Sequence, residues 1–321
     1  MTRREEVSLE AVVGRIDAIA PGSSAPDTVP SGFPSLDRML GGGFRRQDLV
    51  VLGGDVGSGK SALALAMAVR AAQGGMPTLY LSGEMSPERV LERALALEGR
   101  APIDDLRQGR LDAHARAAVG AAAVRLRGMP LLLRPLLGAS FDEVSASLDQ
   151  VPGRALVVVD ALHLAPSPLP ASQLNERIAL AVRALKALAM ERNLTVLALA
   201  QLPEHHRDRT DPRPTLDDLG ALGSIKQTAD LVLGIYREEM YRPGQGVDGA
   251  TELIIAKNRN GATGFVDLFF YPRWLRFEDL LDPEGYADRK SSQDAGLAPA
   301  LSILLSTAPD NSTVEPPPSR A

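Results

Sequence analysis

The chain has 321 residues, and 35 Lys and Arg against 40 Asp and Glu give it a formal net charge of −5. This mild acidity argues against a histone-like coat of positive charge but not against a local basic groove, and the absence of cysteine excludes disulfides, zinc fingers and thiol catalysis. The sequence has no apolar run long enough to span a bilayer and no apolar signal core at its start, so we expect a cytoplasmic protein without membrane contact.

Residues 1–30 predict an N-terminal helix followed by a flexible linker. Apolar residues from Leu9 to Ile19 recur at helical spacing, after Ser8 as a candidate N-cap. Residues 21–30 are rich in Pro, Ser and Gly, which is typical of a linker. The helix cannot bury its apolar stripe alone, so it either folds back onto its own domain or docks on a neighbour.

Residues 31–284 predict one α/β domain in which a mainly parallel central sheet is flanked by helices. The predicted strands are 48–52, 78–82, 131–134, 156–160, 195–200, 231–236, 252–256 and 265–270, and the predicted helices include 61–73, 86–97 and 175–192. The last three strands follow one another without a long helix, so we expect antiparallel strands at that edge. Residues 285–321 are rich in Ser, Pro, Asp and Ala and predict a disordered tail.

The strongest motif is GDVGSGKS, which matches G-x-x-x-x-G-K-[ST] in full and lies between an apolar run and a helical pattern. Its glycines let backbone N–H groups wrap a phosphate, and the helix N-terminus adds partial positive charge. Lys60 can then reach the outer phosphates, and the Ser61 hydroxyl can ligate Mg²⁺. The predicted nucleotide-binding residues are Gly54, Asp55, Val56, Gly57, Ser58, Gly59, Lys60 and Ser61.

Two carboxylates follow predicted strands near this motif. Asp160 ends the apolar run ALVVVD, and a carboxylate there can hold the hydrated Mg²⁺ of a nucleotide. Glu84 follows the strand TLYLS, where it could orient an attacking water as a general base. Glu84 would equally suit the first turn of a helix as a favourable acid, so the residues alone leave both roles open.

Polar residues at two further strand ends complete the candidate set. Gln201 ends the strand TVLALA, where an amide can sense the γ-phosphate or can merely close the strand. Lys257 and Arg259 lie two apart at another strand end, and two such cations point toward the surface, where they could complete a neighbour's nucleotide site. The Asn-Gly pair that follows is a strong turn signal, so a solvated hairpin tip also fits.

With these residues in place, residues 31–279 resemble the C-terminal RecA-type motor domain of DnaB-like replicative helicases. The resemblance is carried by SGFPSLD, the P-loop, YLSGEM, VVVDALHL, LKALAMERNLTVLALAQL, GSIKQTADLVLGIYREEMY and KNRNGATGFVDLFFYPRWLRFE. The last two segments are the most specific. The opening GGGF…DLVVLGGDVGSGKSAL is also similar to RadA-type recombination ATPases, which share the fold.

The resemblance implies a RecA-like P-loop NTPase that uses ATP and Mg²⁺. Lys60 and Ser61 would hold phosphate and Mg²⁺, Asp160 would hold Mg²⁺, and Glu84 would act as the catalytic base. Gln201 would couple the nucleotide to the DNA-binding loops.

The resemblance also implies a homo-oligomeric ring, usually a hexamer, because no subunit completes its own site. Lys257 and Arg259 would act on the ATP of the next subunit, with Arg259 as the arginine finger. Single-stranded DNA and replication or recombination proteins would be the partners.

The DNA loop departs from the family pattern, in which Arg-Glu-Ser-Gly-Ser precedes an Ile. This chain has Gly-Ala-Leu-Gly-Ser at residues 220–224, so the phosphate-binding Arg is missing. The backbone N–H of Gly223 could still grip a phosphate, and three arginines lie in the preceding loop, namely Arg207, Arg209 and Arg213. They alternate with acidic residues, so a solvated loop fits as well as a DNA contact.

We therefore predict an ATP-dependent DNA helicase or translocase of the DnaB-like family, which hydrolyses ATP at the subunit interfaces of a ring and acts on single-stranded DNA. One alternative is a RadA-like recombination ATPase. Another is a ring ATPase with a regulatory role that does not unwind DNA, which the altered loop favours.

Overall fold

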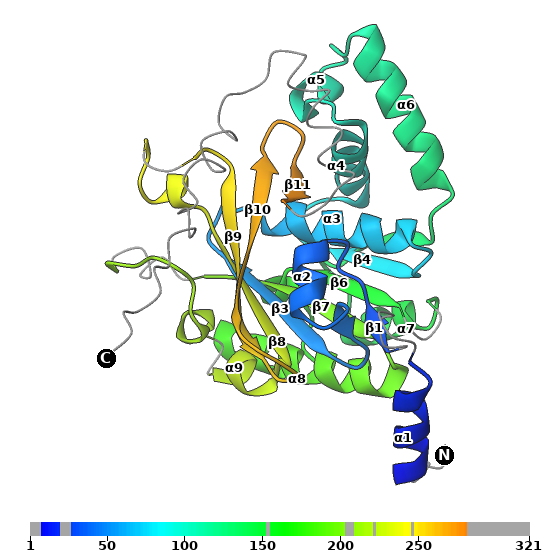
Figure 1. The fold of residues 1–321 in the computed structure, drawn as a ribbon, viewed down its shortest axis with the longest axis vertical. Helices are drawn as coiled ribbons and strands as arrows, with labels where there is room; N and C mark the ends of the chain where they lie inside the picture. The colour runs from blue at the N-terminus through cyan, green and yellow to red at the C-terminus, as the bar shows by residue number, and fades with distance from the viewer. Residues whose placement is uncertain are drawn as a thin grey trace, which may run out of the picture. The chain divides into compact units, whose positions relative to one another are not determined.

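A nine-stranded sheet forms the centre of the fold in the computed structural model, which describes residues 8–19, 27–151, 155–202, 209–220, 223–244 and 247–280 (Figure 1). The strands lie in the order β11-β10-β9-β8-β3-β7-β6-β4-β5. Their bounds are β3 Leu49–Gly54, β4 Thr78–Ser82, β5 Leu131–Pro135, β6 Leu156–Asp160, β7 Thr195–Gln201, β8 Leu231–Tyr236, β9 Ala250–Asn258, β10 Gly264–Tyr271 and β11 Arg276–Asp279. The strands in the spatial order β8-β3-β7-β6-β4-β5 are parallel to one another. β9 pairs antiparallel with β8, β10 with β9, and β11 with β10. The predicted α/β fold with one antiparallel edge is therefore confirmed.

All eight predicted strands are present, and the described ranges contain three more that the sequence pattern missed. β1 (Thr28–Val29) and β2 (Phe44–Arg45) form a separate pair that is too short to show a period. The edge strand β11 reads RFED, and its charged side chains hide the apolar alternation on which a strand prediction depends.

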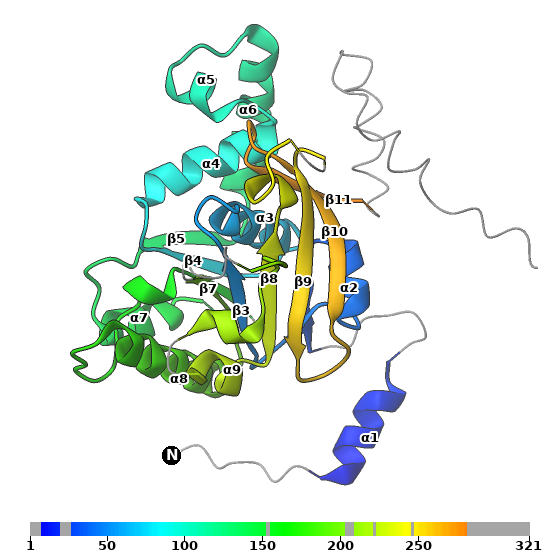
Figure 2. The ribbon, with the colours of Figure 1, turned by 90° about the vertical axis from the view of Figure 1, so that its left-hand side faces the viewer.

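Helices cover both faces of the sheet, as Figure 2 shows, because the buried strands are apolar on both sides. Along β3, Val50 and Leu52 join the core that includes α3, whereas Leu49 and Val51 join the core that includes α8. The helices are α2 Pro34–Met39, α3 Lys60–Gln73, α4 Pro87–Gly99, α5 Ile103–Arg107, α6 Ala113–Arg127, α7 Phe141–Leu148, α8 Leu174–Arg192 and α9 Ser224–Thr228. None in the described ranges is both long enough and apolar enough to cross a bilayer.

The N-terminal helix α1 spans Leu9–Asp17, close to the predicted range. Its apolar side chains at Leu9, Val13 and Ile16 are 73%, 45% and 58% exposed. The sequence left two arrangements open, in which the helix folds back onto its own domain or docks on a neighbour. The structure does not show the first, because the stripe is not buried against the described part of the chain. Most of the predicted linker and all of the predicted tail lie outside the described residues. The predicted domain boundaries therefore stay predictions.

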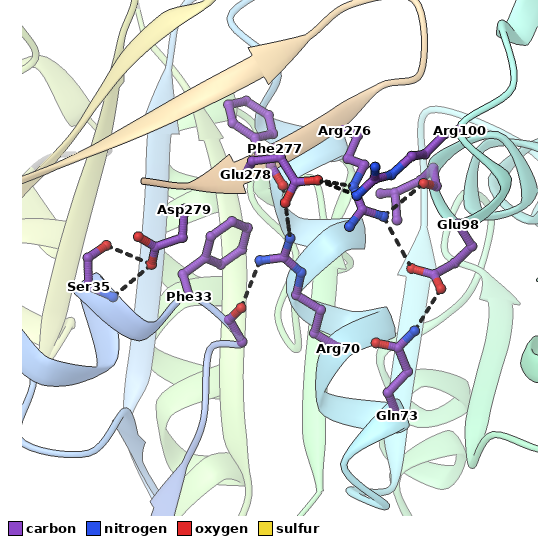
Figure 3. A network of polar contacts seen from close by, with 12 residues as sticks. Phe33, Ser35, Arg70, Gln73, Glu98, Arg100, Arg276, Phe277, Glu278 and Asp279 are labelled. Carbon is purple, nitrogen blue, oxygen red and sulfur yellow. Dashed lines mark hydrogen bonds and ion pairs between the residues drawn. The ribbon is translucent and has the colours of Figure 1, made fainter. Parts of the chain in front are cut away.

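A buried polar network fastens β11 to the helices α3 and α4 (Figure 3). The Glu278 carboxylate, whose side chain is 4% exposed, accepts hydrogen bonds from Arg70 at 3.3 Å, Arg100 at 3.4 Å and Arg276 at 2.5 Å. Arg70 also donates to the Phe277 carbonyl at 2.9 Å. Because a buried carboxylate is costly unless it is paired, these arginines explain how so polar a strand is held in the sheet.

Candidate active site

The P-loop connects β3 to α3, which begins at Lys60. Gly57 and Gly59 have φ angles of +78° and +99°, in the left-handed region that favours glycine. A Cβ atom on Gly54 would lie 2.6 Å from the Ser58 hydroxyl, so the first glycine is needed for close packing inside the loop. The Lys60 ammonium donates to the Asp55 carbonyl at 2.8 Å, which closes the loop over its own lysine.

The interior of this loop suits a phosphate. The Ser58 hydroxyl is buried and has no hydrogen-bond partner among the described residues. Burial lowers the pKa of Lys60, and the carboxylates of Glu84, Asp160 and Asp55 oppose that shift. A largely buried ammonium and an unsatisfied buried hydroxyl in the same loop would both gain from an anion, which is what the motif predicts.

Asp160 and Ser61 meet where a nucleotide-bound Mg²⁺ would lie. Asp160 ends β6, and its carboxylate accepts from the Ser61 hydroxyl at 3.2 Å and from the Tyr80 hydroxyl at 2.7 Å. Burial raises the pKa of Asp160, while these hydrogen bonds lower it. Mg²⁺ bound through phosphates takes one or two protein oxygens and keeps several waters, so this pair fits the cation.

Glu84 lies in the exposed turn after β4 and before α4. The charge of Glu84 raises the pKa of both Lys60 and Asp160. α4 begins at Pro87 and is capped by Ser86, whose hydroxyl accepts from the backbone N–H of Arg89. Glu84 is therefore outside the helix, and the role of a first-turn acid falls to Glu88.

Gln201 lies at the same edge of the sheet as the P-loop. It is the exposed last residue of β7 and pairs in register with Gly54. The next residue, Leu202, donates its N–H to the Gly54 carbonyl at 3.1 Å. The structure thus brings Gln201 together with the P-loop, Glu84 and Asp160, as expected when the carboxyl ends of parallel strands meet at one edge.

Lys257 and Arg259 lie at the other end of the parallel strands. We call the end with the P-loop the P-loop edge of the sheet and the end with Lys257 and Arg259 the finger edge. β9 runs antiparallel to β8, and Lys257 pairs with Val232, near the start of β8. β8 is parallel to β3, so Lys257 and Arg259 lie where β3 begins and the P-loop lies where β3 ends. Six residues of strand span roughly 20 Å at about 3.3 Å per residue, so neither cation reaches the P-loop of its own subunit.

The arginines predicted to contact DNA bind carboxylates within the described chain. Arg209 donates to the buried Asp218 at 3.0 Å and pairs with its second oxygen. Arg213 donates to both oxygens of Glu252 at 2.7 and 2.6 Å, and these hydrogen bonds raise its pKa. Arg207 lies outside the described residues.

The glycines of the DNA loop, Gly220 and Gly223, are joined by a backbone hydrogen bond. The N–H of Gly223 donates to the Gly220 carbonyl at 3.1 Å. Gly220 has φ +58° and ψ −133°, a conformation that is open to glycine and strained for other residues. The Arg of the family pattern therefore cannot replace Gly220 without a change of backbone.

Sequence reasoning missed three side chains that support the site. Tyr80 holds Asp160, as described above. Arg237 donates to the Gly57 carbonyl at 3.3 Å and lies over the Phe270 ring at 4.7 Å. The Phe277 ring would lie 2.9 Å from a Cβ atom on Gly59. Tyr80 lies in the segment YLSGEM, but its contact with Asp160 depends on the pairing of β4 with β6. Arg237 and Phe277 reach the P-loop from segments that are far away in the sequence.

Comparisons with known proteins give matches to helicase domains. The model of the DnaB-like helicase C-terminal domain matches residues 28–279. The replicative DNA helicase DnaB of Leifsonia xyli subsp. xyli is 33% identical over 278 residues, which are 84% of this chain and 61% of that protein. The replicative DNA helicase DnaB of Geobacillus stearothermophilus is 32% identical over 78% of this chain and 56% of that protein. The chain thus spans about three fifths of the length of these curated relatives.

Two solved structures share the fold. One is a DnaB-like replicative helicase described with its interactions with primase, which matches 85% of this chain and 68% of its own chain with a TM-score of 0.80 and 28% identity. The other is a separately solved ATPase domain, with a TM-score of 0.79 and 28% identity over 84% of this chain and 98% of that domain.

Proposed function

The chain belongs to the family of DnaB-like helicase C-terminal domains, and from that membership we propose that it is an ATP-driven DNA helicase or translocase. It would hydrolyse ATP at the subunit interfaces of a homo-oligomeric ring, of hexameric order, and move along single-stranded DNA. The observation that carries the proposal is the division of the candidate site between two edges of one sheet. A subunit that holds the P-loop at one edge and the finger residues at the other needs a neighbour on each side.

Each residue at the P-loop edge has a chemical role in this proposal. Lys60 and the loop amides bind the phosphates of ATP. Ser61 and Asp160 would hold Mg²⁺, which would supply positive charge beside the phosphates. Glu84 orients the attacking water and accepts its proton. Gln201, which pairs with Gly54 at the end of β7, would report the γ-phosphate to the loop that follows β7.

Lys257 and Arg259 would act on the neighbour's ATP. Guanidinium groups stabilise the charge that spreads over the equatorial oxygens in the transition state, and such a finger is worth about 10³–10⁵ in rate. Because the P-loop and the finger residues lie at opposite edges, every interface of a closed ring would receive one P-loop and one finger.

A second candidate is a ring ATPase that regulates or remodels a partner without unwinding DNA. The contacts of Arg209 and Arg213 favour it, because both are occupied by carboxylates of their own chain. Gly220 supports it as well, since the phosphate-binding Arg of the family pattern is absent. A RadA-like role is less well supported, because the relatives described above are replicative helicases.

The deciding experiment measures ATP turnover with and without single-stranded DNA, on protein whose oligomeric state has been determined. The helicase proposal predicts DNA-stimulated turnover and binding with little sequence preference, because the contacts go to the backbone. Affinity should fall with salt, with a log–log slope of about −0.7 for each phosphate contacted. ATP turnover without salt-sensitive DNA binding or stimulation would favour the regulatory ring ATPase. Absence of ATP turnover in the assembled protein would refute both candidates.

A further inference from the structure

The Arg259 side chain is held by two acceptors at the finger edge of the sheet. Its Nε lies 3.4 Å from Asp230 Oδ1, and one terminal nitrogen donates to the Gln227 carbonyl at 3.1 Å. The backbone N–H of Arg259 also donates to the Asp230 carbonyl at 2.8 Å. Even so, 51% of the Arg259 side chain is exposed. The guanidinium is thus held at Nε and at one terminal nitrogen, while half of the side chain is exposed.

Asp230 is itself fixed in the fold. Its side chain is 4% exposed, and Oδ2 accepts from the backbone N–H of Leu49 at 2.9 Å and from the Lys186 ammonium at 2.6 Å. Leu49 begins β3, the strand that leads to the P-loop. The Asp230 N–H in turn donates to the Leu49 carbonyl at 2.9 Å. One carboxylate oxygen therefore joins the sheet, and the other faces the finger.

Lys257 is held by α9, the short helix that also contains Gln227. Its ammonium donates to the Lys226 carbonyl at 2.7 Å and to the Ala229 carbonyl at 2.6 Å, at the end of α9. The last carbonyls of a helix have no partner within the helix and attract cations. Both finger residues thus rest on the C-terminal end of α9, and Arg259 is the one that also forms an ion pair with Asp230.

We propose that Asp230 is a positioning residue for Arg259, which orients the guanidinium for the nucleotide of the neighbouring subunit. This inference rests on the proposed function, in which Arg259 acts in trans. A guanidinium held by a charge-assisted contact at Nε loses less freedom when it meets a phosphate, so less of its interaction energy is spent on ordering. Asp230 does not touch the nucleotide in this proposal and acts through Arg259.

The Asp230→Asn substitution separates the two functions of the carboxylate. An amide oxygen can still accept from Leu49 and Lys186, so the contact with the sheet is kept. The amide NH₂ then faces the Nε–H of Arg259, and two donors cannot bond to each other. Asp48→Asn is the matched control, because it neutralises a neighbouring carboxylate that accepts from Asn260 at 3.2 Å, while the acceptors that hold the Arg259 side chain are Asp230 and Gln227.

The experiment is a double-mutant cycle in ATP turnover with Asp230→Asn, Arg259→Ala and the double variant, all in the full-length assembled protein. We expect Asp230→Asn to lower kcat by about 10- to 100-fold, the range that misplacing a catalytic group costs, with KM for ATP little changed. In the Arg259→Ala background, Asp230→Asn should have almost no further effect. Asp48→Asn should leave kcat close to that of the parent.

The outcomes separate this inference from the proposed function. If Arg259→Ala alone leaves turnover unchanged, the finger assignment fails, and the role of Asp230 fails with it. If Arg259→Ala slows turnover but Asp230→Asn does not, or if the two losses multiply in the double variant, the finger stands and the positioning role is refuted. An equal loss in Asp48→Asn would also refute it, because a general effect of charge would then explain the result.

A readout that does not depend on activity is the rate at which phenylglyoxal modifies Arg259 without nucleotide, followed by mass spectrometry. Release from Asp230 should make the modification faster in Asp230→Asn than in the parent or in Asp48→Asn, and equal rates would contradict the contact. If Asp230→Asn does not fold, the Asp230→Asn/Lys186→Gln pair replaces it, because it leaves no lone buried ammonium. Lys186→Gln then serves as the control in both measurements.

Discussion

The two edges of the central sheet differ in how their charged side chains are supported. At the P-loop edge, Lys60 and Asp160 are largely buried and are held by groups of the loop and of neighbouring strands. At the finger edge, Lys257 and Arg259 rest on helix carbonyls and one carboxylate, and half of the Arg259 side chain is exposed. The first arrangement suits a ligand enclosed within the subunit, whereas the second leaves a cationic side chain exposed at the surface.

The largest expected effect is at the enclosed edge. Lys60→Ala removes the ammonium from the phosphate cradle, where it lies against the Asp55 carbonyl. We expect ATP turnover to fall at least about 10³-fold, because charge stabilisation at the phosphates is lost. Steady-state turnover, together with binding of a fluorescent ATP analogue, measures this. Normal turnover would show that the P-loop lysine has no part in the reaction.

Glu84→Gln should give the next largest effect. The amide keeps the shape of the turn but cannot accept a proton, so we expect hydrolysis to fall by about 10²–10⁴ while ATP still binds. Glu88→Gln is a suitable control, since Glu88 is an exposed acid in the first turn of α4. Comparable rates in Glu84→Gln and Glu88→Gln would show that Glu84 has no role as a base.

The enclosed edge was predictable because its residues share a simple rule. The P-loop is contiguous in sequence, and Glu84, Asp160 and Gln201 each follow an apolar run, so parallel strands bring them to one edge. The supports of the loop were not predictable. Phe277 approaches it from β11 and Arg237 from the position directly after β8, and the register of these strands cannot be read from the sequence.

The finger edge and the DNA loop show a second limit of sequence reasoning. The pair Lys257 and Arg259 was visible in the sequence, but its supports on α9 and Asp230 depend on the pairing of β9 with β8. The same holds for Arg213, whose partner Glu252 is 39 residues away. A cation in a loop looks available until the strand that carries its carboxylate has been placed.

The smallest expected effect concerns the titration of Asp48, which directly precedes β3 at the finger edge. Burial, and then the charge of Asp230, raise the pKa of Asp48 from 3.8 to about 6. The folded protein therefore binds a proton more tightly than the unfolded chain, and ionised Asp48 destabilises the fold at pH 7. This cost is relieved as the pH falls through about 6 toward 4.

Asp48→Asn should therefore raise the free energy of unfolding at pH 7.5, by clearly less than about 3 kcal/mol, because Asp48 is partly exposed and solvent screens its charge. The gain over the parent should shrink toward zero as the pH approaches 4. Urea unfolding of both proteins at pH 7.5 and pH 4.5 measures the difference. An equal difference at the two pH values would show that Asp48 does not titrate in this range.

The central claim is that one nucleotide site is completed by two subunits, and a mixing experiment tests it most directly. Lys60→Ala lacks a working P-loop and Arg259→Ala lacks the finger, so each homo-oligomer should turn over ATP very slowly. After subunit exchange has been verified, the mixture should regain part of the parent activity, because some interfaces then pair an intact P-loop with an intact Arg259. A fully exchanged mixture no more active than its two components would contradict a site shared between subunits.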